Sequence, residues 1–161
     1  MFIKIKVVYL QYQTIIKQTN IMNKAEFITQ QLLPYMQNPS SCGYDNEASE
    51  CQYLTSDGRM CVFGKNLIDP KQFNPNDAAC TLLDRHSQSI LKPQAKAMNL
   101  DIYTWSEMQY IHDKIAISNA GFFDIGDVHR VKRTIESIQK TEKIQLPELT
   151  LAIENLYNNK Q

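Results

Sequence analysis

Four cysteines and three histidines carry most of the reactive chemistry in this sequence. Cys42, Cys51, Cys61 and Cys80 are separated by eight, nine and eighteen residues, whereas structural zinc sites usually place paired ligands two to four residues apart. A zinc site built from Cys51, Cys61, Cys80 and His86 would therefore require the fold to bring distant residues together. The spacing favours four thiols without a cofactor, and zinc is kept as the alternative.

A catalytic cysteine needs a base that holds it as a thiolate, and this base is usually histidine. Cys61 and His112 are the pair that could meet this need, but no protease or transferase signature surrounds either residue. The sequence also lacks GxGxxG, GxxxxGK[ST], HExxH and GxSxG. These features favour a protein that is not an enzyme, with Cys61 and His112 as the catalytic candidates if it is one.

The charges of the sequence balance to a formal net charge of zero. Proteins that coat nucleic acid neutralise phosphates with lysine and arginine, so this balance argues against a nucleic-acid partner. One basic segment stands out, with Arg130, Lys132 and Arg133 on a predicted helix. These three residues are candidates for contact with an acidic partner or an anion, and the alternative is a solvated helix face.

The stretch CQYLTSDGRMCVFG predicts an antiparallel β-hairpin at about residues 51–64. Asp57-Gly58 is a strong turn signal, and aromatic and β-branched residues flank it. The predicted register places Cys51 and Cys61 diagonally on one face, with Cα atoms roughly 7–8 Å apart, which is too far for easy disulfide formation. We also expect Gly64 to let a helix approach the sheet closely.

Amphipathic periodicity predicts the helical part of the chain. We expect helices over residues 23–33, 75–90, 105–117 and 128–142, a short helical turn at 94–99, and a last helix that begins at Pro147. The expected fold class is therefore α+β: a mostly helical single domain of five or so helices packed on a small hairpin.

Local signals place the ends of these helices. Asn23 with Glu26 and Thr104 with Glu107 have the spacing of capping boxes. Asp127 is expected to cap the helix that follows it, and Pro34 is expected to limit the first helix.

The first 21 residues differ in composition from residues 22–161, which are expected to form the single helical domain. They are either an N-terminal extension or an edge strand, and translation starts at Met1 or at Met22. The longest apolar run near this end, Val7 to Leu10, is too short for a membrane span or a signal segment. We therefore expect no membrane association and a cytoplasmic location.

The hairpin and one later segment resemble a pattern in small uncharacterised proteins of tailed bacteriophages and prophages. The matching elements are Cys51-x-Tyr53, Gly58-x-x-Cys61-x-x-Gly64, Leu67-Ile68-x-Pro70 and Ile111-His112-Asp113. The likeness covers about residues 22–117. This sequence departs from the pattern at Val62-Phe63, where small residues are more usual, and in its longer C-terminal pair of helices. The resemblance implies a phage accessory protein of the bacterial host cytoplasm and assigns no chemistry.

Two classes of function follow. The first is a non-enzymatic binding or interaction protein for host takeover or counter-defence, with a host or phage protein as its partner. The alternative is a small thiol- or zinc-dependent enzyme, or a sponge that binds a nucleotide ligand, using Cys61, His112 and the basic segment. The sequence leaves the oligomeric state open.

Overall fold

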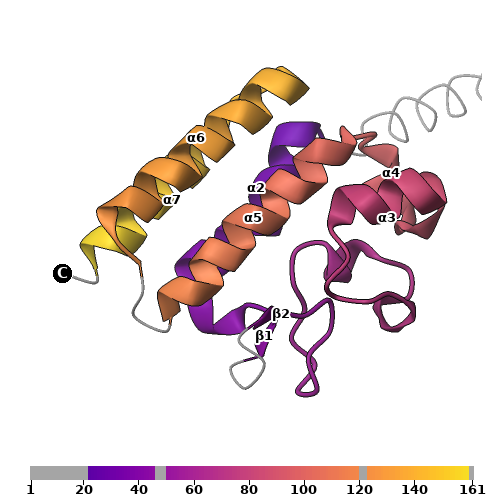
Figure 1. Ribbon diagram of the computed structural model, residues 1–161. Helices are drawn as coiled ribbons and strands as arrows, with labels where there is room; N and C mark the ends of the chain where they lie inside the picture. The colour runs from indigo at the N-terminus through magenta and orange to yellow at the C-terminus, as the bar shows by residue number, and fades with distance from the viewer. Residues whose placement is uncertain (1–21, 46–49, 120–122, 160–161) are drawn as a thin grey trace, which may run out of the picture.

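The computed structural model describes residues 22–45, 50–119 and 123–159. In this part of the chain, six α-helices and one two-stranded antiparallel sheet form a mostly helical α+β domain (Figure 1). The predicted fold class is thus confirmed. The extension or edge strand predicted for residues 1–21 lies outside the described residues.

Helix α2 spans Lys24–Gln37 and begins with the predicted capping box. The Asn23 side chain accepts a hydrogen bond from the Glu26 N–H at 2.9 Å, and the Glu26 carboxylate accepts one from the Asn23 N–H at 3.0 Å. The helix continues through Pro34, so the prediction that this proline limits it was wrong. The added turn buries Tyr35 and Met36 in the core, which offsets the hydrogen bond that proline cannot donate.

The helix predicted over residues 75–90 is shorter in the structure. Helix α3 spans Ala79–His86 and is followed by the 3₁₀ turn η4, Ser87–Ile90. Before α3, the Asn74 side chain accepts a hydrogen bond from the Asn76 N–H, and its carbonyl accepts one from the Asp77 N–H. These bonds close a turn, and the helix therefore begins only at Ala79. Helix α4, Pro93–Ala97, corresponds to the predicted turn at 94–99.

Helix α5 spans Ile102–Asn119 and starts three residues earlier than predicted. Thr104 does not form the expected capping box with Glu107, because its hydroxyl donates to Glu142 from within the helix. Asp101 takes the capping role, since its carboxylate accepts a hydrogen bond from the Tyr103 N–H at 2.8 Å. A buried carboxylate on another element thus replaced the local partner.

Helix α6, Ile125–Glu142, is capped by Asp124, and Asp127 is the N3 residue that completes its capping box instead of the predicted cap. Helix α7, Pro147–Asn158, begins at Pro147 as predicted. Helices α2, α5, α6 and α7 pack into the main body, with α3 against α5 (Figure 1). The indole of Trp105 packs edge-on against Phe27 and Phe63. It thereby joins this body to the chain between α2 and α3, residues 38–45 and 50–78, which we call the irregular segment.

The hairpin is present but lies earlier in the chain than predicted. Strands β1, Tyr44–Asp45, and β2, Glu50–Cys51, pair with Tyr44 opposite Cys51. Residues 52–63 contain no strand, and the predicted hairpin at 51–64 is therefore wrong in position. The Asp57-Gly58 turn does form: Gly58 has φ +86°, and the Thr55 N–H donates to the Arg59 carbonyl at 2.8 Å.

Two glycines let the irregular segment fold tightly on itself. A Cβ on Gly64 would lie 2.0 Å from the Tyr53 carbonyl oxygen, and one on Gly43 would lie 2.4 Å from the Cys61 nitrogen. Gly64 therefore admits the Tyr53 backbone, and not a helix as predicted. Two further 3₁₀ turns, η2 at Gly64–Asn66 and η3 at Pro70–Gln72, follow before α3, and η1 at Pro39–Ser41 follows α2.

Candidate functional site

A pocket of about 470 Å³ lies between β2, the turn before α3 and one face of α5. Helix α5 supplies a polar stripe at helical spacing to this pocket, opposite its apolar stripe. The stripe consists of Ser106, Gln109, Tyr110 and Asp113. The glycine-dependent folding of residues 42–64 brings β2 onto this stripe, so the pocket depends on both the helix and the irregular segment.

The lining of this pocket combines acidic and aromatic groups. Its carboxylates are Glu50, Asp77 and Asp113, and its phenol rings are Tyr44, Tyr53 and Tyr110. We call this set the acid–tyrosine pocket. Among the residues that the structure describes, no lysine or arginine lines it, and neither Glu50 nor Asp113 has a lysine or arginine as an ion-pair partner. Asp77 is 3.6 Å from Arg85, whose side chain is 60 % exposed.

At the inner wall of the pocket, Cys51 meets His112 and Asp113. The Cys51 sulfur, an imidazole nitrogen of His112 and a carboxylate oxygen of Asp113 lie within 4.8 Å of one another. The imidazole Nδ1 is 3.1 Å from Asp113 Oδ1, and the ring is fully buried edge-on against Tyr35 at 4.7 Å between centroids. Its Nε2 has no hydrogen-bond partner among the described residues.

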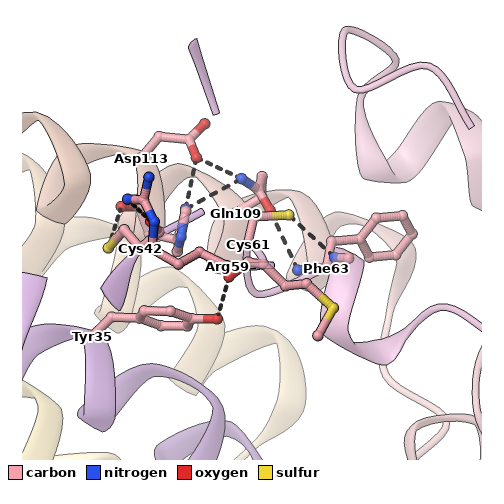
Figure 2. Close-up of polar contacts among 10 residues, drawn as sticks. Tyr35, Cys42, Arg59, Cys61, Phe63, Gln109 and Asp113 are labelled. Carbon is pink, nitrogen blue, oxygen red and sulfur yellow. Dashed lines mark hydrogen bonds and ion pairs between the residues drawn. The ribbon is translucent and has the colours of Figure 1, made fainter. Parts of the chain in front are cut away.

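Gln109, one turn earlier on α5, contacts the two members of this cluster that the helix supplies (Figure 2). Its amide nitrogen donates to Asp113 Oδ1 at 2.5 Å and lies 3.5 Å from His112 Nδ1. Its amide oxygen accepts a hydrogen bond from the Phe63 N–H at 3.4 Å. The irregular segment thereby fixes the side chains of α5 that face the pocket.

Cys61 lies beside this network but is no candidate nucleophile at neutral pH. Its sulfur is buried and accepts a hydrogen bond from the Gly64 N–H at 3.1 Å. Burial raises the pKa of this thiol to about 12, against a partial lowering by the Gly64 N–H. Gln109 lies between Cys61 and the His112 ring, and it contacts both. The structure thus links the predicted Cys61–His112 pair through an amide.

The other two cysteines near the site are also held as neutral thiols. Burial raises the pKa of Cys42 to about 12, with a further rise from the negative charge of Asp113. Burial raises the pKa of Cys51 strongly, and the charge of Asp113 and a hydrogen bond to it add to the effect. All four cysteines are free. Without a metal, these thiols serve as weak donors and apolar filler, not as reagents.

Arg59 joins the loops that carry these residues. Its guanidinium donates to the carbonyls of Cys42 at 2.9 Å and Tyr44 at 3.1 Å, and to the Asp57 carboxylate at 2.7 Å. The turn at Asp57-Gly58 is thereby tied to the start of β1. Tyr35 adds a second tie, because its hydroxyl donates to the Met60 carbonyl at 2.8 Å.

The predicted zinc ligands do not converge as a set in the described part of the chain. Cys51 and Cys61 lie near the pocket, but His86 is exposed at the end of α3 and packs against Phe73. Cys80, at the start of α3, is half-buried, and its N–H donates to the Ser106 hydroxyl. The cluster that does converge joins Cys51 with His112 and Asp113 instead.

The basic segment on α6 is on another part of the molecule. Arg130 is paired with Asp127 at 2.8 Å, and Lys132 forms an ion pair with Glu154 of α7. Arg133 is exposed. Two of the three predicted anion contacts are therefore engaged by carboxylates within the fold, and their role toward a partner stays a prediction.

Sequence reasoning missed Gln109 and Asp113 as site residues. The available signal was the polar spacing of Ser106, Gln109, Tyr110 and Asp113, which predicts one polar face on a helix whose other face is apolar. A polar helix face is usually solvated, so this spacing alone could not identify the pocket. The second half of the site, β2, depends on tertiary packing.

Comparison with known proteins gives no match of the chain to a protein-family model, to a curated protein or to a solved structure. Among the residues that the structure describes, no helix has both the length and the apolar character that crossing a membrane requires.

Proposed function

We propose that this chain is a non-enzymatic binding protein that captures a cationic group in the acid–tyrosine pocket. The composition of the pocket carries this proposal, because three carboxylates and three phenol rings line it and none of its described lining residues is a lysine or arginine. The likeness of the 51–70 segment to tailed-phage proteins supports an accessory role in a bacterial host, where the partner would be a host or phage protein.

The physical preference for a cation has two sources. Carboxylates that share a pocket repel one another, and a bound positive charge relieves this repulsion. The face of a tyrosine ring attracts a cation within about 6 Å of its centroid. Lys114 lies 5.8 Å from the Tyr110 centroid, so one ring at the edge of the site already faces a cation.

Binding is favoured over catalysis because the described thiols near the pocket are not activated as nucleophiles. The pKa values of Cys42, Cys51 and Cys61 are all raised by burial, so each sulfur stays protonated at neutral pH. A nucleophilic thiol needs the opposite shift. The contact of His112 with Asp113 orients the ring, but it directs no base toward a sulfur that could ionise.

The test compares cations with matched neutral ligands. We expect N-acetylargininamide or Zn²⁺ to shift the backbone NMR signals of Ser106 and Tyr110, and N-acetylcitrullinamide, the neutral counterpart of the arginine ligand, to leave them unchanged. Glu50→Gln should weaken binding of the cation about three- to tenfold, because one pocket charge is lost. Asp84→Asn, on the exposed side of α3, is the matched control and should have no effect.

The proposal is contradicted if no cation in this panel moves the pocket signals more than the citrulline ligand does. It is also contradicted if Glu50→Gln and Asp84→Asn weaken the binding equally, because the effect would then be one of net charge and not of the pocket.

A further inference from the structure

The donors at the inner wall of the pocket differ from those in its outer part. Three different ligand atoms meet there: a sulfur, an imidazole nitrogen and a carboxylate oxygen. We propose that Cys51, His112 and Asp113 bind a transition-metal ion of the Zn²⁺ class, with one coordination position open toward the pocket. This inference rests on the proposed cation-binding function and names the class of cation.

The separation of the three donor atoms suits such an ion. Atoms at the corners of an equilateral triangle with sides of 4.8 Å, the upper limit here, lie about 2.8 Å from its centre (4.8 divided by √3). Zinc bonds to sulfur at about 2.3 Å and to nitrogen or oxygen at about 2.0–2.2 Å. A contraction of roughly half an ångström at each ligand therefore completes the bonds, which rotation of side chains can provide.

The kinds of donor favour a particular class of metal. Thiolate and imidazole ligands suit Zn²⁺, Co²⁺ and their neighbours, whereas Mg²⁺ and Ca²⁺ prefer oxygen ligands throughout. When the ion binds, the Cys51 thiol releases its proton to solvent and the sulfur donates its lone pair to the metal. Three protein ligands leave a fourth, tetrahedral position for water or for a group that enters the pocket.

The placement of His112 is a second indication. Its ring is fully buried, and its Nδ1 lies 3.1 Å from Asp113 Oδ1, so the nitrogen and oxygen donors already lie side by side. The ring is held beside Asp113 by Tyr35 and Gln109 rather than left to solvent.

The surrounding contacts are of the type that supports metal ligands. The Gln109 amide donates a hydrogen bond to the Asp113 carboxylate and accepts one from the Phe63 N–H. The carboxylate is therefore oriented by a side chain that is itself anchored to the backbone. Residues that hydrogen-bond to metal ligands in this way orient those ligands and raise the affinity for the metal by about 10- to 100-fold. We therefore assign Gln109 a positioning role.

Cobalt serves as the probe, because a cobalt–thiolate bond gives a charge-transfer absorption in the near ultraviolet, and tetrahedral cobalt absorbs in the visible range. The full chain, stripped with EDTA and dialysed under reducing conditions, is titrated with Co²⁺ and then with Zn²⁺. We expect one equivalent of Co²⁺ to bind with both absorptions and Zn²⁺ to displace it. Mg²⁺ at the same concentration should not displace Co²⁺.

The variants identify the ligands. Cys51→Ala should remove the charge-transfer absorption and weaken Co²⁺ binding at least 100-fold, and Asp113→Asn should weaken it about tenfold while the sulfur absorption remains. Cys80→Ala is the matched control, because Cys80 is equally half-buried but lies outside the cluster. Far-ultraviolet circular dichroism checks that each variant is folded. If Cys51→Ala does not fold, the test uses Asp113→Asn, whose side chain is 39 % exposed in the parent protein.

Each outcome decides between the two proposals. If Co²⁺ does not bind stoichiometrically, or if the thiolate absorption survives in Cys51→Ala, the metal site is wrong. If N-acetylargininamide still binds in that case, the cation pocket stands and only the class of cation changes. If neither the metal nor the arginine ligand binds, both proposals fail.

Discussion

The thiol of Cys61 has a structural role that its chemistry does not reveal. Its sulfur accepts the Gly64 N–H at the start of a 3₁₀ turn, in the way that an oxygen does at a helix N-cap. Gly64 must remain a glycine because a Cβ there would lie 2.0 Å from the Tyr53 carbonyl oxygen. The Cys-x-x-Gly spacing is therefore explained by packing. An exposed cysteine at the same spacing would instead suggest a reactive thiol.

We predict that Cys61 is protected from alkylation in the native protein. Its side chain is 0 % exposed, so the reagent cannot reach the sulfur, and burial raises its pKa to about 12, so very little thiolate forms. Iodoacetamide at pH 8, followed by peptide mass spectrometry, should modify Cys61 at least 100-fold more slowly than the half-buried Cys80, because reaction requires local opening. In denaturant the two rates should converge. Equal rates in the native protein would show that Cys61 is accessible.

At the scale of elements, one carboxylate fixes how three helices meet. Glu142, at the end of α6, accepts hydrogen bonds from the Asp101 N–H and the Thr104 hydroxyl, both at 2.7 Å, and forms an ion pair with Lys24 of α2. Its charge faces the first turn of α5, where the helix dipole favours an anion. This is the contact that displaced the predicted Thr104–Glu107 capping box.

We predict that Glu142 makes the unfolding free energy fall as the pH becomes acidic. These three contacts hold its pKa below the ordinary 4.5 despite burial, which acts in the opposite direction. Because the folded pKa is lowered, the unfolded chain binds more protons at acidic pH. The contribution is therefore complete above about pH 4.5 and is lost as the pH falls through the folded value.

Glu142→Gln tests this with chemical denaturation at several pH values. At pH 7 we expect the variant to lose about 1–3 kcal/mol of unfolding free energy, since a buried acceptor is weakened and Lys24 loses its partner. The difference from the parent protein should shrink below pH 4.5. Glu136→Gln, an exposed residue of the same helix, is the control and should change little. A pH-independent difference would mean that the carboxylate charge does not contribute.

At the scale of the whole molecule, the sequence predicted the elements that have a periodic apolar pattern or a local capping signal. The apolar stripes of α2, α5, α6 and α7 identified these helices, and Asn23 with Glu26 identified one start correctly. The two strands have two residues each, and no periodicity exists at that length. The Cys51–His112–Asp113 cluster joins β2 to α5 across a long stretch of chain, so only tertiary packing could reveal it.

The irregular segment also depends on the helices for its stability, because two short strands alone are marginal in water. Phe63 is its main anchor: the side chain is fully buried and packs edge-on against Trp105 at 5.7 Å and Tyr53 at 5.7 Å between centroids. Trp105 in turn contacts Phe27 of α2 at 6.0 Å. The rings of Phe63, Trp105 and Phe27 thus connect the segment, α5 and α2 through one core.

We predict that the segment and the helices unfold together. Trp105 is the one tryptophan of the sequence, so its fluorescence reports this aromatic core, while far-ultraviolet circular dichroism reports the helices. In urea, both signals should have the same midpoint, as expected for a single cooperative unit. Phe63→Ala should lower the unfolding free energy by about 3–5 kcal/mol and move both midpoints equally, because it leaves a cavity in the shared core.

Ile68→Ala is the matched control for this variant. Ile68 belongs to the same irregular segment but is 62 % exposed, so its truncation should change the unfolding free energy by less than about 0.5 kcal/mol. If Phe63→Ala moved the fluorescence midpoint and left the dichroism midpoint in place, the segment would unfold independently of the helices. The pocket between β2 and α5 would then open without global unfolding, and its geometry could not select a ligand as a rigid site does.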